Sequence, residues 1–470
     1  MRQLTKSVLI LLIITTLFQS FYSTRALAAF SVGDEKKVGE QLLTLIRREF
    51  KLIDEPDIIQ YINELGRSTL EVAGPQFFDY HFFVINNKEL NAFAAPSGLI
   101  FFHTGLIESL DSEGELVGVV AHEIGHVASR HLASRFSKGS MINAATTLGV
   151  LLGVAIGGGA LSEALISGSM AAGQSAYLSF SRLDEEEADR LAFNWMMDQN
   201  RDPEAMVEML RKLHNISRYR HGYIPPYLMT HPRPDIRMSY IQDLTLFTDQ
   251  KTYVQVDEFE FQRFKSRIMS ITKEPMQLIN YHENSVSFLE PGTPKAAMGH
   301  YLLSQSYLAA GNYVQAENEL RKTMTIYPDK SILKADLGVI YLNSGQYKNA
   351  LVQLQEARKA DRNNAYATFN LAQVLEKTGE LKGATDLYEE LLITMPDFSQ
   401  LYYQLANVNA LLGNQGEVYY YNGFYHWYEG DLKSAKYNYS KAVTLLPQDS
   451  RMRADAESML QKIVEFEKER

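Results

Sequence analysis

A strict spacing of glycines is the feature that most limits how this chain can fold. Gly311, Gly345, Gly379 and Gly413 lie 34 residues apart, and an alanine follows each of the first three by five residues. A glycine that ends one helix, together with a small residue that lets helices approach closely, predicts one helix pair per unit. The second half of the chain is therefore expected to be a stack of such pairs.

The glycine spacing restarts half a unit further on. Gly430, Ala435 and Pro447 repeat the pattern, so one helix near residues 416–429 is expected to serve two neighbouring pairs. Thirty-four residues is the tetratricopeptide period, and stacked pairs of this kind form a superhelix with a concave binding face. A last helix over about residues 451–467 is expected to cap the array. The many tyrosines near this end are expected to pack helix against helix, with a minority left as a surface for unfolded chains.

The first half contains a motif that predicts chemistry. His122, Glu123 and His126 form an H-E-x-x-H sequence, which places two imidazoles one turn apart on one helix face. Ser112 and Glu115 have the spacing of a capping box, and the apolar residues that follow predict a helix over about 112–134. Two such imidazoles can bind one Zn²⁺. The alternative is a pair of solvated or capped histidines on an ordinary helix.

A third metal ligand is expected on a second helix. The chain contains no cysteine, so the ligand should be His, Glu or Asp. In the acidic run over residues 184–189, Glu185 shares a stripe with apolar residues, and a carboxylate buried there must be paired or bound to metal. Asp189 lies on the same face and is positioned to orient a ligand histidine. The alternative is a solvated acidic helix start.

These residues resemble the M48 family of zinc metallopeptidases. The H-E-x-x-H motif is followed by an E-x-x-A-D helix, and two further segments, Asn91–Gly98 and Thr230–Pro232 with Arg237, match the family over roughly residues 35–245. The resemblance implies an α+β, gluzincin-like fold with one Zn²⁺ per chain. It implies that the metal ligands are His122, His126 and Glu185 and that the general base is Glu123.

Two more histidines have weaker assignments. His231 is expected either to stabilise the oxyanion of the reaction or to occupy the open zinc position and hold the enzyme inactive, and it is otherwise a plain loop residue. His131 is a poor ligand candidate, because on a continuous helix it lies half a turn away from the metal face.

The substrate is expected to be an extended polypeptide. Tyr80–Ile85 and Leu99–Phe102 predict a short antiparallel sheet beside the metal helix, and such a sheet can pair a substrate strand. The alternative is that the strands only cover the core.

The N-terminus predicts export. Basic residues, an apolar run and an A-x-A site make residues 1–28 a secretory signal peptide, with an uncleaved anchor as the alternative. The periplasm is the expected compartment, and the bacterial origin follows from the resemblance. The net charge of −10 gives no reason to expect nucleic-acid binding. Residues 141–172, apolar and rich in small residues, are expected to cover the zinc cleft and to touch a membrane surface or a client, with a transmembrane hairpin or a buried helix pair as alternatives.

The chain thus divides into a signal peptide (1–28), a peptidase domain (29–250), a helical connector (251–295) and an all-α repeat domain (296–470). An exported peptidase of this family followed by such repeats resembles the periplasmic β-barrel assembly-enhancing group of the family. This resemblance implies cleavage of unfolded or misassembled envelope proteins, with the repeats contacting clients or the outer-membrane assembly machinery. The alternative is a chaperone-like assembly factor in which the repeats dominate and proteolysis is secondary.

Overall fold

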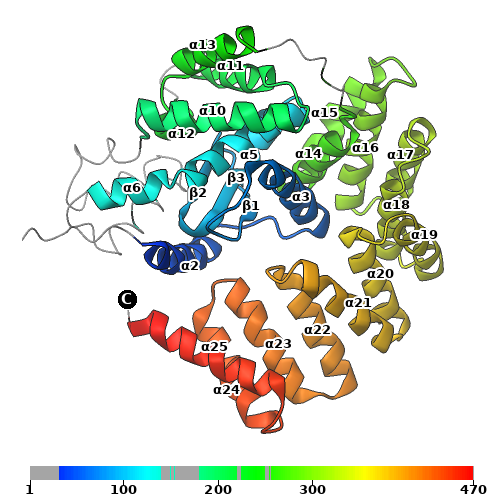
Figure 1. The fold of residues 1–470 in the computed structure, drawn as a ribbon. Helices are drawn as coiled ribbons and strands as arrows, with labels where there is room; N and C mark the ends of the chain where they lie inside the picture. The colour runs from blue at the N-terminus through cyan, green and yellow to red at the C-terminus, as the bar shows by residue number, and fades with distance from the viewer. Residues whose placement is uncertain are drawn as a thin grey trace, which may run out of the picture.

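The described part of the chain begins with two helices and a small sheet (Figure 1). α2 (Val32–Glu49) and α3 (Pro56–Ala73) precede the strands β1 (His81–Ile85), β2 (Ala92–Ala95) and β3 (Leu99–His103). The computed structural model describes residues 31–138, 179–219, 224–248 and 256–468, together with 149, 153 and 253. The predicted signal peptide and nearly all of the predicted cover, 141–172, lie outside the described residues.

The three strands form a mixed sheet in the order β1-β3-β2. The two predicted strands, β1 and β3, are parallel, so the expectation that they form an antiparallel sheet is wrong. β2, which lies between them in the sequence, pairs with β3 in the antiparallel direction. The physical reason is the short 3₁₀ turn Pro96–Gly98, which folds β2 back against one edge of β3. β1 pairs with the opposite edge of β3. Because β2 lies between β1 and β3 in the sequence and reverses the chain direction, β1 and β3 run parallel.

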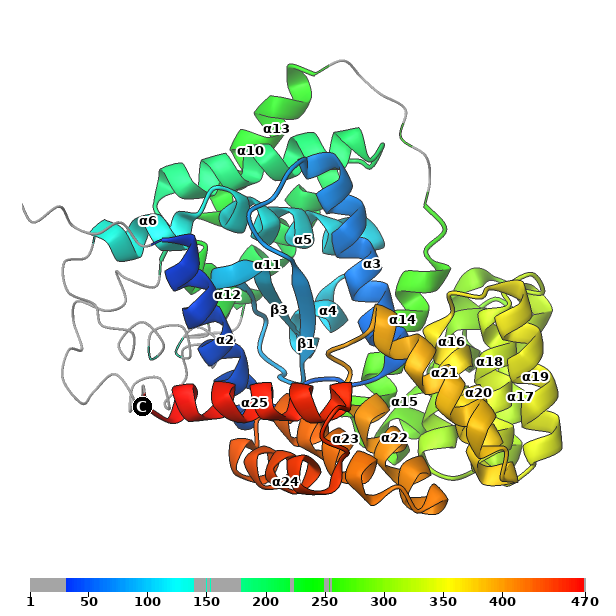
Figure 2. The ribbon, with the colours of Figure 1, turned by 60° about the horizontal axis from the view of Figure 1, so that its bottom comes forward.

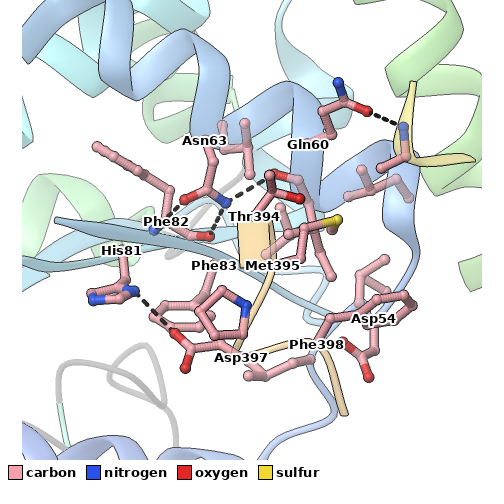
Figure 3. A pocket seen from close by; sticks show the side chains of 18 of the residues that line it. Asp54, Gln60, Asn63, His81, Phe82, Phe83, Thr394, Met395, Asp397 and Phe398 are labelled. Atoms are coloured by element: carbon pink, nitrogen blue, oxygen red, sulfur yellow. Dashed lines mark hydrogen bonds and ion pairs between the residues drawn. The ribbon is translucent and has the colours of Figure 1, made fainter. Parts of the chain in front are cut away.

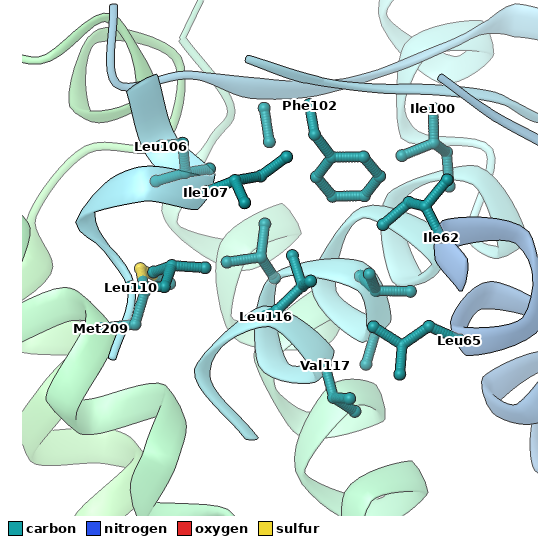
Figure 4. Packing of buried hydrophobic residues seen from close by; sticks show 14 of the residues in the cluster. Ile62, Leu65, Ile100, Phe102, Leu106, Ile107, Leu110, Leu116, Val117 and Met209 are labelled. Carbon is teal, nitrogen blue, oxygen red and sulfur yellow. The ribbon is translucent and has the colours of Figure 1, made fainter. Parts of the chain in front are cut away.

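The core of the first domain lies between this sheet and the metal-motif helix (Figure 4). α4 (Thr104–Ser109) follows β3 directly, and α5 (Glu113–Ala128) crosses beneath the sheet. Phe102 of β3 packs among aliphatic side chains that come from α3, α4 and α5, and all of them are buried: Ile62, Leu65, Ile107, Leu116 and Val117. Burial on this scale fixes α5 as the rigid support of its histidines.

The helix predicted over 112–134 is interrupted. It begins as expected, since the Ser112 side chain accepts a hydrogen bond from the Glu115 backbone N–H, but it ends at Ala128. Arg130 has a φ of 51°, and a new helix, α6 (His131–Lys138), begins immediately after it. Left-handed backbone at a residue other than glycine is uncommon and needs support from its surroundings. The Arg130 side chain donates hydrogen bonds to buried Glu35 of α2, which supplies that support.

In the described residues, six further helices lie between α6 and the repeats. They are α10 (Arg182–Asp198), α11 (Glu204–Tyr219), α12 (Pro226–Thr230), α13 (Pro234–Leu246), α14 (Phe259–Thr272) and α15 (Pro275–Ser287). Of the helices that the structure describes, none is both long enough and apolar enough to cross a lipid bilayer.

The helical array follows, and its period is the predicted one. The helices are α16 (Pro294–Ala309), α17 (Tyr313–Ile326), α18 (Ile332–Asn343), α19 (Tyr347–Ala360), α20 (Ala365–Thr378), α21 (Leu381–Thr394), α22 (Ser399–Leu412), α23 (Gln415–Tyr428), α24 (Leu432–Leu445) and α25 (Arg451–Lys468). The repeat glycines follow the ends of helices with φ between 74° and 85°, a conformation that glycine adopts without strain. α23 packs against both α22 and α24, as the half-unit shift predicts. An α+β domain followed by an all-α array is the fold class expected from the sequence.

The array curves back onto the first domain, so that its last helices lie under α2 (Figure 2). Lys462 of α25 lies 3.3 Å from Glu40 of α2. A cavity of about 820 Å³ remains between the two parts, lined by α3, β1 and the turn between α21 and α22 (Figure 3). Across it, His81 of β1 lies 3.0 Å from Asp397.

Candidate metal centre

Two helices and one turn bring the predicted site residues together. α5 carries His122, Glu123 and His126, α10 carries Glu185, and His231 ends α12. All five side chains are at most 3% exposed. The two helices approach closely because Gly125 faces α10, where a Cβ would lie 3.1 Å from the Cα of Ala188.

Four of these side chains point potential ligand atoms at one place. One ligand atom from each of His122, His126, Glu185 and His231 lies within 4.8 Å of the others. The Nε2 atoms of His122 and His126 are 3.0 Å apart, and Nε2 of His126 is 3.5 Å from Oε1 of Glu185. Nδ1 of His231 lies 3.0 Å from the same Glu185 oxygen. Such convergence of buried imidazole and carboxylate groups is costly unless a cation or protons join them.

The protonation of these groups fits a divalent metal. Burial holds the pKa of His126 well below its ordinary value, so the ring is neutral and can donate a lone pair. Burial opposes ionisation of Glu185, but Arg237 and His231 outweigh it and hold the pKa of that carboxyl well below its usual range. Both Glu123 oxygens and Nε2 of His231 make no hydrogen bond within the described chain, and Nε2 of His231 lies 3.4 Å from Oε1 of Glu123. Nitrogen and oxygen donors left open in this way suit a divalent transition-metal ion.

A second layer of polar contacts holds the first. Oδ1 of Asp189 lies 2.8 Å from Nδ1 of His122, the place expected for a group that orients this ring. Arg237 donates two hydrogen bonds to Asp189, of 2.8 and 2.7 Å, and lies 2.9 Å from Oε2 of Glu185. Sequence reasoning matched Arg237 to a family segment but gave it no role. A buried arginine that faces two acidic residues on α10 is visible only in three dimensions.

Sequence reasoning also missed three groups that pack around the histidines. Nδ1 of His131 lies 2.9 Å from Nδ1 of His126, because the interruption after α5 turns His131 back toward the centre. The ring of Phe180 stacks on that of His126, with 3.8 Å between the centroids. Tyr227 stacks on His231 with 4.5 Å between the centroids. The prediction that His131 lies half a turn away from the metal face assumes a continuous helix. The structure has an interruption there, because α5 ends at Ala128.

Comparison with known proteins gives the same picture. The model of peptidase family M48 matches residues 54–245, and a tetratricopeptide-repeat model matches residues 307–367 and 341–408. The beta-barrel assembly-enhancing protease of Escherichia coli K12 is 26% identical over 396 residues, which cover 84% of this chain and 80% of that protein. The protein of the same name from Yersinia pestis is 28% identical over 400 residues, covering 83% and 80%.

A more distant relative shares part of the chain. The mitochondrial metalloendopeptidase OMA1 of Schizosaccharomyces pombe is 25% identical over 184 residues, or 39% of this chain and 52% of that protein. Together with the cluster of buried ligand atoms, these matches make the chain a metalloendopeptidase whose residues 54–245 belong to peptidase family M48 and whose later helices are tetratricopeptide repeats.

Proposed function

We propose that the metal is zinc, held by His122, His126 and Glu185, and that Glu123 is the general base. Two imidazoles and one carboxylate are the protein ligands of a common class of catalytic zinc site. The observation that carries the proposal is the state of Glu123. Its side chain is fully buried in the centre, and neither carboxylate oxygen makes a hydrogen bond within the described chain, although Nε2 of His231 lies 3.4 Å from Oε1. A buried carboxylate is left in this way where a water or substrate group completes it.

The residues of the chain then divide the hydrolysis between them. A bound zinc ion lowers the pKa of water and polarises the scissile carbonyl. Glu123 takes a proton from the attacking water as the new C–O bond forms. It passes that proton to the leaving amine as the C–N bond breaks. Asp189 and Arg237 keep His122 and Glu185 in place during both steps.

We propose that His231 is a fourth ligand in the resting enzyme. Its Nδ1 lies 3.0 Å from Glu185 and 3.3 Å from Nε2 of His122, inside the group of ligand atoms. A residue there occupies the position that a water or substrate needs. His231→Ala should therefore raise the rate at which an unfolded protein is cleaved. A fall of the rate constant at unchanged metal content would instead assign His231 to oxyanion stabilisation.

Glu123→Gln tests the general base. The substitution keeps the shape of the side chain and removes the base, so cleavage of an unfolded protein by the full chain should fall by about 10²–10⁴-fold. The zinc content of the purified variant, measured by atomic emission, should equal that of the parent. Undiminished cleavage would remove Glu123 from the mechanism.

We propose unfolded or misassembled envelope proteins of the bacterial periplasm as substrates, with the repeats binding clients or the outer-membrane assembly machinery. Relatives named beta-barrel assembly-enhancing protease align with both parts of the chain. β2 also lies at an edge of the sheet and packs on α5, where an extended substrate can add as a further strand.

A chaperone-like assembly factor is the second candidate. The repeat helices make up α16–α25, so a large part of the chain is devoted to a surface that binds without catalysing. The same Glu123→Gln variant separates the two. If it restores β-barrel assembly in a strain that lacks the protein, binding is the main output, and if it does not, proteolysis is.

A further inference from the structure

We infer that His131 is a positioning residue that fixes the ring of His126 toward the metal. This inference rests on the metal site proposed above. Nε2 of His126 faces His122 and Glu185, at 3.0 and 3.5 Å, whereas Nδ1 faces away from them. A neutral imidazole that binds metal through Nε2 carries its proton on Nδ1, and that proton needs an acceptor. Nδ1 of His131 lies 2.9 Å away and takes this place.

The other nitrogen of His131 completes the chain of contacts. Since Nδ1 of His131 accepts, its own proton lies on Nε2, which is 3.4 Å from Oε2 of Glu187. Glu187 also accepts a hydrogen bond of 3.2 Å from the hydroxyl of Ser129. One carboxylate of α10 therefore holds both sides of the interruption between α5 and α6.

The interruption is what makes the contact possible. On a continuous helix, a residue five positions after His126 points about 140° away from it. The left-handed backbone of Arg130 turns the chain, and His131, which is 4% exposed, comes back against His126. Arg130 is anchored by its hydrogen bonds to Glu35 of α2. A strained residue held by a half-buried ion pair is the arrangement expected where the local geometry serves a site.

The two ligand histidines thus have different supports. His122 is oriented by an ionised pair, Asp189 with Arg237. His126 is instead oriented by the ring of His131 and is covered on its face by Phe180, with 3.8 Å between the ring centroids. In the part of the chain that the structure describes, the group within hydrogen-bond distance of Nδ1 of His126 is His131, so His126 depends on it for the acceptor.

Three substitutions of His131 in the full-length chain test this role. Asparagine places a side-chain oxygen where histidine has Nδ1 and keeps the acceptor, whereas glutamine extends its amide to the Nε2 position and loses it. The zinc dissociation constant of each metal-free variant is measured by competition with a chromophoric chelator. His131→Ala and His131→Gln should weaken zinc binding by about 10–100-fold, and His131→Asn should stay near the parent value. Glu187→Gln, at the exposed end of the chain of contacts, should change it least.

The thermal unfolding of the metal-free variants separates positioning from folding. Equal unfolding temperatures for His131→Asn and His131→Gln, with different zinc affinities, support the inference. Unchanged zinc affinity in His131→Ala and His131→Gln overturns it, and so does an equal loss in all three variants. A parent protein that binds no zinc would overturn the proposed function itself, and this inference with it.

Discussion

The orientation of His122 depends on one acidic side chain, and Arg237 contacts both that acid and the ring. Asp189 contacts His122 on one side and Arg237 on the other, and all three are buried. Asp189→Asn removes the negative charge that polarises the ring and leaves Arg237 without one of its two partners. Zinc affinity should fall by about 10–100-fold, the usual cost of removing a group behind a ligand. Isothermal titration of the metal-free protein with zinc measures it.

The matched control for this change is Asp198→Asn, at the exposed far end of the same helix. Its zinc affinity should equal that of the parent. If Asp189→Asn also binds zinc as the parent does, Asp189 has no part in holding the ligand.

Single residues of the site could be predicted from sequence where they share a helix. The stripe on α10 singled out Glu185 and Asp189, and both are buried against α5. Arg237 lies on α13, and only the packing of α13 against α10 and α11 brings it to the acids. His131 was excluded because no glycine marks the interruption at Ser129 and Arg130. Contacts that depend on tertiary packing or on strained backbone leave no periodic signal.

Between elements, the approach of α5 to α10 controls the site. A Cβ at position 125 would lie 3.1 Å from Cα and 3.2 Å from O of Ala188, which are backbone atoms of the helix that carries Glu185. Gly125→Ala should therefore shift α10 by a few tenths of an ångström and lower kcat/KM for a fluorogenic peptide by about tenfold. Alanine raises helix propensity by about 1 kcal/mol, so a loss of activity would not come from a weaker helix.

Gly118→Ala is the control in the same helix. Its Cβ would lie 2.9 Å from Cγ of Met206, the flexible part of a side chain that can move aside. Activity should stay at the parent level. Equal activities for the two variants would show that the spacing of α5 and α10 does not limit the reaction.

Elements were predicted well where they were repeated and poorly where they were single. A glycine with positive φ follows α16, α18, α20, α22 and α23, so the sequence marks where these helices end. The sheet has only three short strands, and hydrophobic alternation identifies a strand without giving its direction. The parallel pairing of β1 with β3 follows from the chain path around β2, which no local pattern records.

Across the whole molecule, α14 joins the two parts through buried charges. Arg263 donates hydrogen bonds to Asp57 of α3 and to Asp336 of α18, at 2.9–3.1 Å. Arg267 does the same to Asp57 and Glu55. Any other orientation of the two parts would leave one of these buried charges unpaired, which costs free energy. The network therefore favours one orientation of the repeats on the first domain. The sequence predicts a helical connector. It does not predict the ion pairs of that connector with α3, because they join residues more than 200 positions apart in the chain.

A second contact between the two parts should make stability depend on pH. Asp54, just before α3, hydrogen-bonds the hydroxyl of Ser399 at the start of α22. Burial raises the pKa of Asp54 to about 7. The hydrogen bond from Ser399 and the charge of Arg47 oppose the rise, and Glu429 and Glu55 add to it. In the unfolded chain the pKa is near 3.9. Between these values the folded chain keeps a proton that the unfolded chain has released, so this group makes the fold less stable as the pH rises from about 4 to about 7.

Asp54→Asn copies the protonated side chain at every pH. The unfolding temperature of the variant, minus that of the parent, should therefore grow between pH 5 and pH 7 and become constant above pH 7. Differential scanning calorimetry at pH 5, 6, 7 and 8 measures the difference, in which all other titrating groups cancel. Asp449→Asn, at an exposed position, should give a flat difference. A flat difference for Asp54→Asn as well would mean that the carboxyl is ionised in the folded chain, stabilised by the hydrogen bond that Ser399 donates and by Arg47.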